Sequence, residues 1–138
     1  MYIGLLHLHS NLPYLLFLLM VVVIIKSLVG WISAKSFDKL TKQFVLFSMI
    51  VAHIQWTVGA ILYFVSPNVR PIGEAMSDSL SRLYALEHPL LMTVAVVLLT
   101  IARSKSKRST ESKQYRTAFI YFSLALISIV LCLPPSWL

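Results

Sequence analysis

Histidine is the residue type in this sequence best suited to bind a cofactor. The chain has four histidines, and each lies in or beside a long apolar run: His7, His9, His53 and His88. A polar side chain inside a membrane span is costly and needs a partner or a function. Neutral imidazoles facing each other from two helices can ligate a haem iron from both sides, and helix bundles commonly build cofactor sites in this way.

The composition indicates that these histidines lie in a membrane. Of the 138 residues, 58% are hydrophobic and 12% are charged, whereas about a quarter of a soluble domain is charged. Such a chain cannot present an ordinary water-facing surface. We therefore expect one all-α domain over residues 1–138, folded as an integral membrane four-helix bundle.

Four apolar stretches approach the roughly 20 residues that a helix needs to cross a bilayer. The predicted spans are residues 14–33, 44–65, 84–102 and 118–133. The first can extend toward Leu5, with Pro13 in its first turn or at a kink, and the short last span is expected to begin near Tyr115. Because no basic residue precedes Lys26, we expect a retained first helix rather than a cleaved signal peptide.

The basic residues are concentrated in the first and third connections. The first has three lysines and one aspartate, the third has six basic residues and one glutamate, and the second is balanced. Short basic loops stay in the cytoplasm, so both termini are expected outside. The basic run over residues 103–116 is expected to contact anionic lipid headgroups rather than a soluble partner, and the net charge of +7 needs no nucleic acid to explain it.

Depth along the helices sorts the histidines. At a rise of 1.5 Å per residue, His88 lies about 7 Å below the outer start of its span, and His9 lies at a comparable level. We predict that these two face each other in the outer half and ligate haem b. His53 lies about 18 Å from the outer end of its span and is a supporting or alternative ligand. His7 can replace His9, but only one of the two can point into the bundle, and His9 is nearer the span.

Residues beside these histidines complete the predicted cofactor site. Gly59, one turn after Gln55, allows a neighbouring helix or a flat macrocycle to approach closely. Glu87 precedes His88 and Pro89 follows it. Because proline removes a backbone donor and opens the helix locally, Pro89 would set the angle of His88 or free a carbonyl for its ring proton.

Three other interpretations of the histidines remain open. They can form interhelical hydrogen bonds in a cofactor-free accessory or structural subunit of a larger membrane complex. They can bind copper, since Met92 lies one turn below His88 and histidine and methionine suit that metal. Glu87 and His53 can relay protons, although they do not form a complete path. A small-molecule or ion carrier ranks lower still, because one unit leaves little room. No nucleophile–base–acid set appears, so an electron carrier or subunit is favoured over a stand-alone enzyme.

Several short blocks of the sequence resemble a family of small bacterial four-helix membrane proteins labelled cytochrome b-like. These blocks, which extend over nearly the whole chain, are Leu6-His7-Leu8-His9-Ser10, Ala52-His53-Ile54-Gln55 with Gly59 and Tyr63-Phe64, Glu87-His88, and Arg103-Ser104-Lys105-Ser106-Lys107. The resemblance implies a b-type haem protein of the bacterial inner membrane that transfers electrons or senses redox state. Its expected partners are the lipid bilayer and either other respiratory membrane subunits or a second copy.

The chain is also distantly similar to one half of heme A synthase. In that family a helix with a histidine at its outer end precedes a Gln-x-x-x-Gly helix, and a later helix supplies a second outer-side histidine. The matching positions here are His9, Gln55 with Gly59, and His88. Ser10 stands where an arginine often follows the first histidine, and only one four-helix unit is present, so the similarity does not imply synthase activity.

Overall fold

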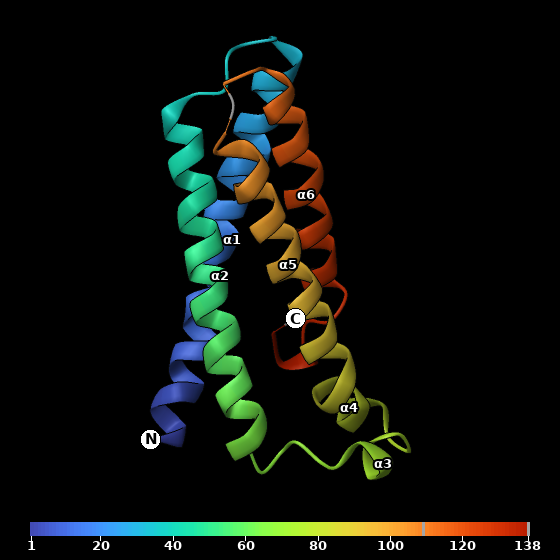
Figure 1. The fold of residues 1–138 in the computed structure, drawn as a ribbon. Coiled ribbons are helices and arrows are strands. Elements are labelled where there is room, and N and C mark those ends of the chain that lie inside the picture. Colours follow the sequence, from blue (N-terminus) through green and yellow to red (C-terminus); the bar gives the residue numbers. More distant parts are fainter. Residues whose placement is uncertain (109, 138) are drawn as a thin grey trace.

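The computed structural model describes residues 1–108 and 110–137 and shows a bundle of four long helices (Figure 1). The long helices are α1 (Tyr2–Ile32), α2 (Lys39–Val65), α5 (His88–Ser106) and α6 (Lys113–Val130). The short ones are α3 (Ile72–Ala75), α4 (Ser79–Arg82), the π-helix η1 (Leu83–Glu87) and the 3₁₀-helix η2 (Pro135–Trp137). The predicted all-α bundle is thereby confirmed.

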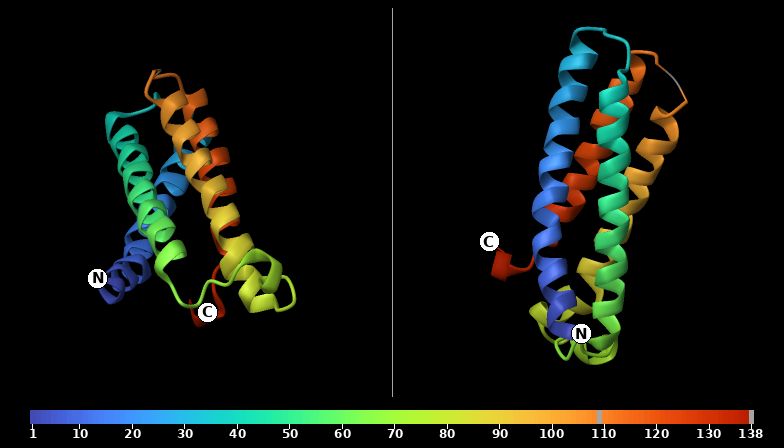
Figure 2. Two further views of the ribbon diagram at one scale, coloured as in Figure 1. Left: turned by 60° about the horizontal axis from the view of Figure 1, so that its bottom comes forward. Right: turned by 90° about the vertical axis from the view of Figure 1, so that its left-hand side faces the viewer.

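The long helices run alternately up and down and form a square. Helix α1 packs against α2 and α6, and α5 packs against the same two helices, so α1 and α5 are diagonal. The N-terminus, the connection between α2 and α5 and the C-terminal segment lie together at one end, here named the site end (Figures 1 and 2). The other end, named the basic end, carries the connections over residues 33–38 and 107–112.

Three helical segments are long and apolar enough to cross a membrane: Tyr2–Ile32, Lys39–Val65 and Ser79–Ser106. The last of these joins α4, η1 and α5 without a break. Large apolar side chains point outward from all three, such as Leu18, Phe47 and Leu90, each more than half exposed. The chain is therefore a multi-pass membrane protein in contact with lipid. Helix α6 begins with a polar first turn and does not reach the same apolar length.

The helices extend beyond several of the predicted spans. Helix α1 begins at Tyr2, so Pro13 lies well inside it rather than in its first turn. Helix α6 begins at Lys113 and ends at Val130, before the predicted end of the fourth span. Span prediction counts apolar residues, whereas a helix continues into polar turns wherever water and capping groups satisfy its backbone.

Fully buried apolar side chains from all four helices fill the middle and the basic end of the bundle. They include Met20 and Val23 of α1, Val45 of α2, Leu99 of α5 and Phe122 of α6. Toward the site end this packing gives way to a cavity. The packed core therefore holds the four helices together and ends where the cavity begins.

At the basic end, Asp38 joins three helices. Its carboxylate accepts the backbone N–H of Thr41 at 2.6 Å, which caps α2, and the hydroxyl of Tyr115 at 3.1 Å. The ammonium group of Lys26 lies 3.6 Å away. Burial opposes ionisation of Asp38, but the hydrogen bonds from Thr41 and Tyr115 and the charge of Lys26 outweigh it and hold the pKa of this carboxyl below its ordinary value.

The ring of Tyr115 reaches Asp38 by lying directly on Gly30 of α1. A Cβ atom built on Gly30 would lie 2.5 Å from the ring, whereas one built on Gly4 in the same helix would meet nothing within 4 Å. We expect Gly30→Ala to lower the free energy of unfolding by about 1–3 kcal/mol, the usual cost of overpacking. Gly4→Ala should be neutral or mildly stabilising, since alanine favours a helix over glycine by up to about 1 kcal/mol.

Thermal unfolding of the two variants in one detergent measures this difference. Equal melting temperatures for Gly30→Ala and Gly4→Ala would show that the Tyr115 ring can move aside without cost. That result would remove the close approach of α1 and α6 from the features that stabilise the bundle.

Candidate cofactor-binding site

A cavity of about 520 Å³ opens at the site end, between α1, α2, α5 and the segment that follows α6. This volume lies within the range of roughly 300–1,000 Å³ that small-molecule sites occupy. Most of the wall is apolar. Polar side chains also reach it, among them His9, Gln55, Trp56, Tyr63 and His88. A mostly apolar wall with a few convergent polar groups is the usual form of a binding site for a cofactor.

His9 of α1 and His88, the first residue of α5, lie beside each other in the wall of this cavity, with their rings in a T-shaped arrangement. Their ring centres are 6.2 Å apart and their planes are inclined at 74°. Both side chains are half-buried. The structure thus brings together the two histidines that depth arguments paired, although they come from helices diagonal to each other in the bundle.

Pro13 explains how His9 is held. In an α-helix the carbonyl of His9 would accept a hydrogen bond from the backbone N–H four residues later, and proline has none. The side chain of Gln55 on α2 supplies the missing donor, with its Nε2 2.8 Å from the carbonyl oxygen of His9. The same Nε2 lies 3.1 Å from Nδ1 of the His9 ring. One glutamine therefore satisfies the backbone and orients the imidazole.

Pro89 produces a second case of the same kind. It deprives the carbonyl of Ala85 of its helical donor, and the hydroxyl of Tyr63 on α2 donates to that oxygen at 3.0 Å. The turn before His88 widens into the π-helix η1, in which the N–H of His88 bonds to the carbonyl of Leu83. Single π-turns of this kind occur often at functional sites, and this one directly precedes the half-buried imidazole.

The second ring nitrogen of His88 is fixed by the end of α6. Nδ1 lies 3.0 Å from the carbonyl oxygen of Cys132. A carbonyl can only accept, so Nδ1 carries the ring proton and Nε2 carries the lone pair. The carbonyl of Ala85, which Pro89 frees, therefore does not accept this proton: it accepts from the hydroxyl of Tyr63, and the carbonyl of Cys132 accepts from His88.

Gln55 gives His9 a different tautomer from that of His88. As it lies, the amide donates to Nδ1, so a neutral His9 ring carries its proton on Nε2. Gln55 Oε1 is buried and has no hydrogen-bond partner in the described part of the chain. If the amide turns so that Oε1 and Nε2 exchange places, Oε1 accepts from Nδ1–H and Nε2 of His9 is free to bind a metal. This rotation of the amide removes the hydrogen bond from Nε2 to the carbonyl of His9, so it costs free energy.

Gly59 makes room for the His9 ring. A Cβ atom at this position would lie 2.8 Å from Cε1 of His9. Gln55 and Gly59 therefore both contact His9: Gln55 hydrogen-bonds to its ring and carbonyl, and Gly59 packs against its ring. The expected neighbour of this glycine was a helix or a flat macrocycle, whereas in the structure it is the imidazole of His9.

Three other predicted site residues lie apart from this group. His53 is exposed on the outside of α2, where its Nδ1 is 2.8 Å from the carbonyl of Met49. His7 is exposed on α1. Glu87 binds Arg82 through a 2.7 Å salt bridge, and it is not part of the cavity wall. The structure therefore does not bring His53, His7 or Glu87 to the histidine pair.

The structure adds residues that the sequence analysis did not assign to the site. The carbonyl of Cys132 and the hydroxyl of Tyr63 are described above, and Trp56 donates through Nε1 to the hydroxyl of Thr93 at 2.9 Å, which links α2 to α5. Pro13 and Pro89 could have predicted these contacts from the sequence, because each leaves the carbonyl four residues earlier without its helical donor. Which side chain would supply that donor depends on the packing of the helices.

Comparison with known protein families, curated proteins and solved structures finds no match. The chemistry of the site is therefore argued from its geometry. Within residues 1–108 and 110–137, no cluster of three or more histidine, cysteine, aspartate or glutamate side chains is placed to hold a metal ion. Two imidazoles alone suit a metal whose other ligands come from a macrocycle. Met92 also lines the cavity, which leaves a copper site with at most one further soft ligand.

The role of Tyr63 as a replacement donor can be tested with Pro89. We expect Tyr63→Phe to destabilise the protein by about 0.5–2 kcal/mol, because it leaves a buried carbonyl without a donor. In a Pro89→Ala background the new backbone N–H can serve that carbonyl, so the same substitution should cost less. Thermal unfolding of the two single variants and the double variant measures this coupling. Strict additivity would show that Tyr63 does not replace the missing donor.

Proposed function

We propose that this protein binds haem b between His9 and His88 and transfers electrons, or senses redox state, near the outer face of the bacterial inner membrane. The observation that carries the proposal is the 6.2 Å separation of the two ring centres. Imidazole nitrogens bind transition metals at about 2.0–2.1 Å, so two rings ligating one ion from opposite sides have centres about 6 Å apart. The planes of such rings can be inclined freely about their common axis, and 74° is compatible with this.

The rest of the site supports the same assignment. The tautomer of His88 leaves Nε2 as the metal-binding atom, and its Nδ1–H bond to Cys132 is the second-nitrogen contact that metal-bound histidines almost always have. His9 completes the pair when the amide of Gln55 turns. The apolar cavity of about 520 Å³ offers space for a hydrophobic cofactor beside the two rings.

Haem, when bound, supplies one-electron redox chemistry at its iron. The residues of this chain set the conditions for that chemistry. Cys132 makes the His88 ring a stronger ligand by accepting its proton in a hydrogen bond. The apolar wall excludes water and lowers the local dielectric, two of the features by which a protein adjusts a redox potential. Gln55 and Gly59 keep the His9 ring directed at the cavity.

The proposed orientation rests on charge. The first and third connections, which are strongly basic, share the basic end of the bundle, and short basic loops remain in the cytoplasm. Both termini, and with them the histidine pair, would then lie on the outer side. This requires α6 to cross the membrane as the fourth span. Two observations support a membrane-spanning α6. This helix packs along α1 and α5, and its charged residues lie only in its first turns, at the basic end.

The resemblance to the small four-helix proteins labelled cytochrome b-like adds to the proposal. It suggests that the chain works with other respiratory membrane subunits or as a homo-oligomer. The exposed apolar surface of the helices leaves ample area for such contacts within the membrane.

An absorption spectrum tests haem binding directly. We expect protein purified in detergent from haem-sufficient cells to show a Soret band that shifts on reduction with dithionite. His88→Ala and His9→Ala should each remove the six-coordinate, low-spin spectrum and most of the bound haem, because each deletes a ligand. His53→Ala and His7→Ala are matched controls, since both histidines are exposed, and their spectra should be unchanged.

A wild-type protein without a Soret band would refute haem binding and leave the cofactor-free accessory subunit as the favoured interpretation. If the spectrum were lost in His53→Ala and retained in His9→Ala, the ligand pair proposed here would be wrong. Circular dichroism of each variant separates loss of haem from loss of fold.

Gly59→Ala provides a test that leaves both ligands in place. The added Cβ would overlap Cε1 of His9, so the ring must move away from its present position. We expect haem affinity to fall about 10- to 100-fold, as is usual when residues that orient metal ligands are changed. Gly73→Ala is a control, since a Cβ there meets nothing within 4 Å. Unchanged haem affinity in Gly59→Ala would mean that the position of His9 is not critical.

A further inference from the structure

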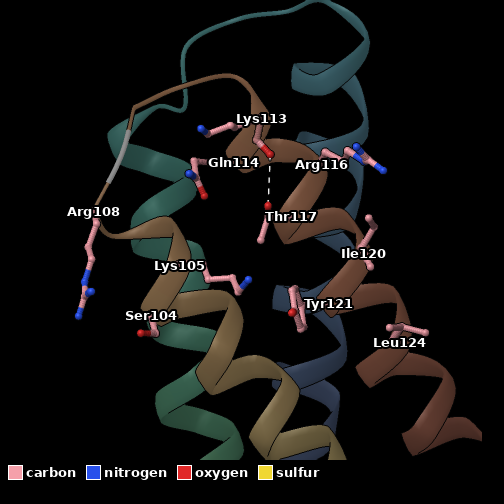
Figure 3. A pocket seen from close by; sticks show the side chains of 10 residues that line it. All are labelled: Ser104, Lys105, Arg108, Lys113, Gln114, Arg116, Thr117, Ile120, Tyr121 and Leu124. Carbon is pink, nitrogen blue, oxygen red and sulfur yellow. Dashed lines mark hydrogen bonds between the residues drawn. The ribbon is translucent and has the colours of Figure 1, made fainter.

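An open groove of about 750 Å³ lies at the basic end, between the last turns of α5 and the first turns of α6. Figure 3 shows its side chains, with Lys105 beside Tyr121, Lys113 and Arg116 nearer the start of α6, and Leu124 further along that helix. The groove is on the opposite end of the bundle from the histidine pair, so it is independent of the proposed haem site.

Three cations of this groove are free of carboxylate partners. Lys113 is paired with Glu111 at 2.7 Å. No carboxylate within the described ranges lies within 4 Å of the charged groups of Lys105, Arg108 or Arg116. The ammonium group of Lys105 lies 5.7 Å from the centre of the Tyr121 ring, and the guanidinium group of Arg116 lies 5.9 Å from the centre of the Trp31 ring. An anion entering the groove would therefore meet unneutralised positive charge.

Gln114 adds a buried polar group to the same groove. Its side chain is only 9% exposed, and its Oε1 has no hydrogen-bond partner in the part of the chain that the structure describes. Leaving a buried acceptor unsatisfied is costly. A ligand with a hydroxyl donor beside its negative charge would satisfy Gln114 and the free cations together.

The lower wall of the groove is apolar. Its apolar residues are Ile120 and Leu124, which follow Arg116 at four-residue spacing along one face of α6. At 1.5 Å per residue, Leu124 lies about 12 Å further along the helix than Arg116, toward the middle of the bundle. A soluble anion would leave this wall uncovered, whereas the acyl chain of a lipid would cover it.

We infer that this groove is a binding site for an anionic phospholipid with a glycerol headgroup. Its phosphate binds Lys105, with Arg108 and Arg116 adding positive charge on either side (Figure 3). A headgroup hydroxyl donates to Oε1 of Gln114, and an acyl chain lies along Ile120 and Leu124. This is more than the general attraction of basic loops to a charged membrane, because it predicts a stoichiometric site on one helical hairpin.

The test uses full-length protein in a neutral detergent with phosphatidylglycerol and phosphatidylcholine of identical acyl chains. Native mass spectrometry counts the lipids retained and gives their affinities. We expect one tightly held phosphatidylglycerol. In Lys105→Gln/Arg116→Gln its affinity should fall at least about tenfold, since each basic residue near a membrane surface contributes about fivefold. Lys35→Gln/Lys39→Gln removes the same charge from the other connection at this end and should leave the affinity unchanged.

Two outcomes would overturn the site. Equal losses in the two double variants would mean that the attraction is diffuse. Displacement of the lipid by soluble glycerol phosphate at comparable concentration would mean that the groove binds a free phosphate compound. Gln114→Leu tests the hydroxyl contact, because it should reduce the preference for phosphatidylglycerol over phosphatidic acid by about fivefold, the loss of one hydrogen bond. An unchanged preference would contradict the glycerol headgroup.

Discussion

Inside a bilayer every backbone polar group must find its partner within the protein, and the site end of this bundle is built around that constraint. Pro13 and Pro89 each remove a donor from a membrane-spanning helix. Side chains of α2 supply the replacements, with Gln55 bonded to the carbonyl of His9 and Tyr63 to that of Ala85. Helix α2 is consequently tied to both helices that carry the histidine pair. The interruptions that would weaken an isolated helix become the points at which three helices are held in fixed positions.

The same constraint makes the two histidines chemically unequal. His88 donates a hydrogen bond from its ring N–H to the carbonyl of Cys132, which follows the end of α6, so the tautomer of His88 is set by the backbone. His9 depends on the amide of Gln55, which can present either a donor or an acceptor to the ring. The pair therefore consists of one imidazole fixed by the backbone and one whose hydrogen bonding depends on a side-chain amide. The π-turn directly before His88 positions this imidazole in the cavity wall.

The two ends of the bundle have different physical roles. At the site end apolar walls surround few polar groups, and the packed core opens into a cavity. At the basic end Asp38 connects α1, α2 and α6 through Lys26, Thr41 and Tyr115, which closes the bundle tightly beneath its charged loops. Helix α6 extends between the two ends, since its first turns line the groove at the basic end and the Cys132 carbonyl that bonds to His88 comes two residues after its last turn.

The sequence by itself determined the class of the protein, because apolar runs and basic loops depend only on composition. It also determined that His9 and His88 lie at one level, since depth along a helix follows from residue spacing. The sequence did not determine which side chains point into the bundle and which point outward. His53 and Gln55 are two residues apart and cannot share a helical face, so once Gln55 points inward, as the tertiary structure has it, His53 must point outward. Only the tertiary structure decided that Glu87 pairs with Arg82 and that Cys132 accepts from His88. Such contacts depend on the rotation of each helix and on where its chain ends, and both are set by packing against neighbouring helices rather than by local sequence.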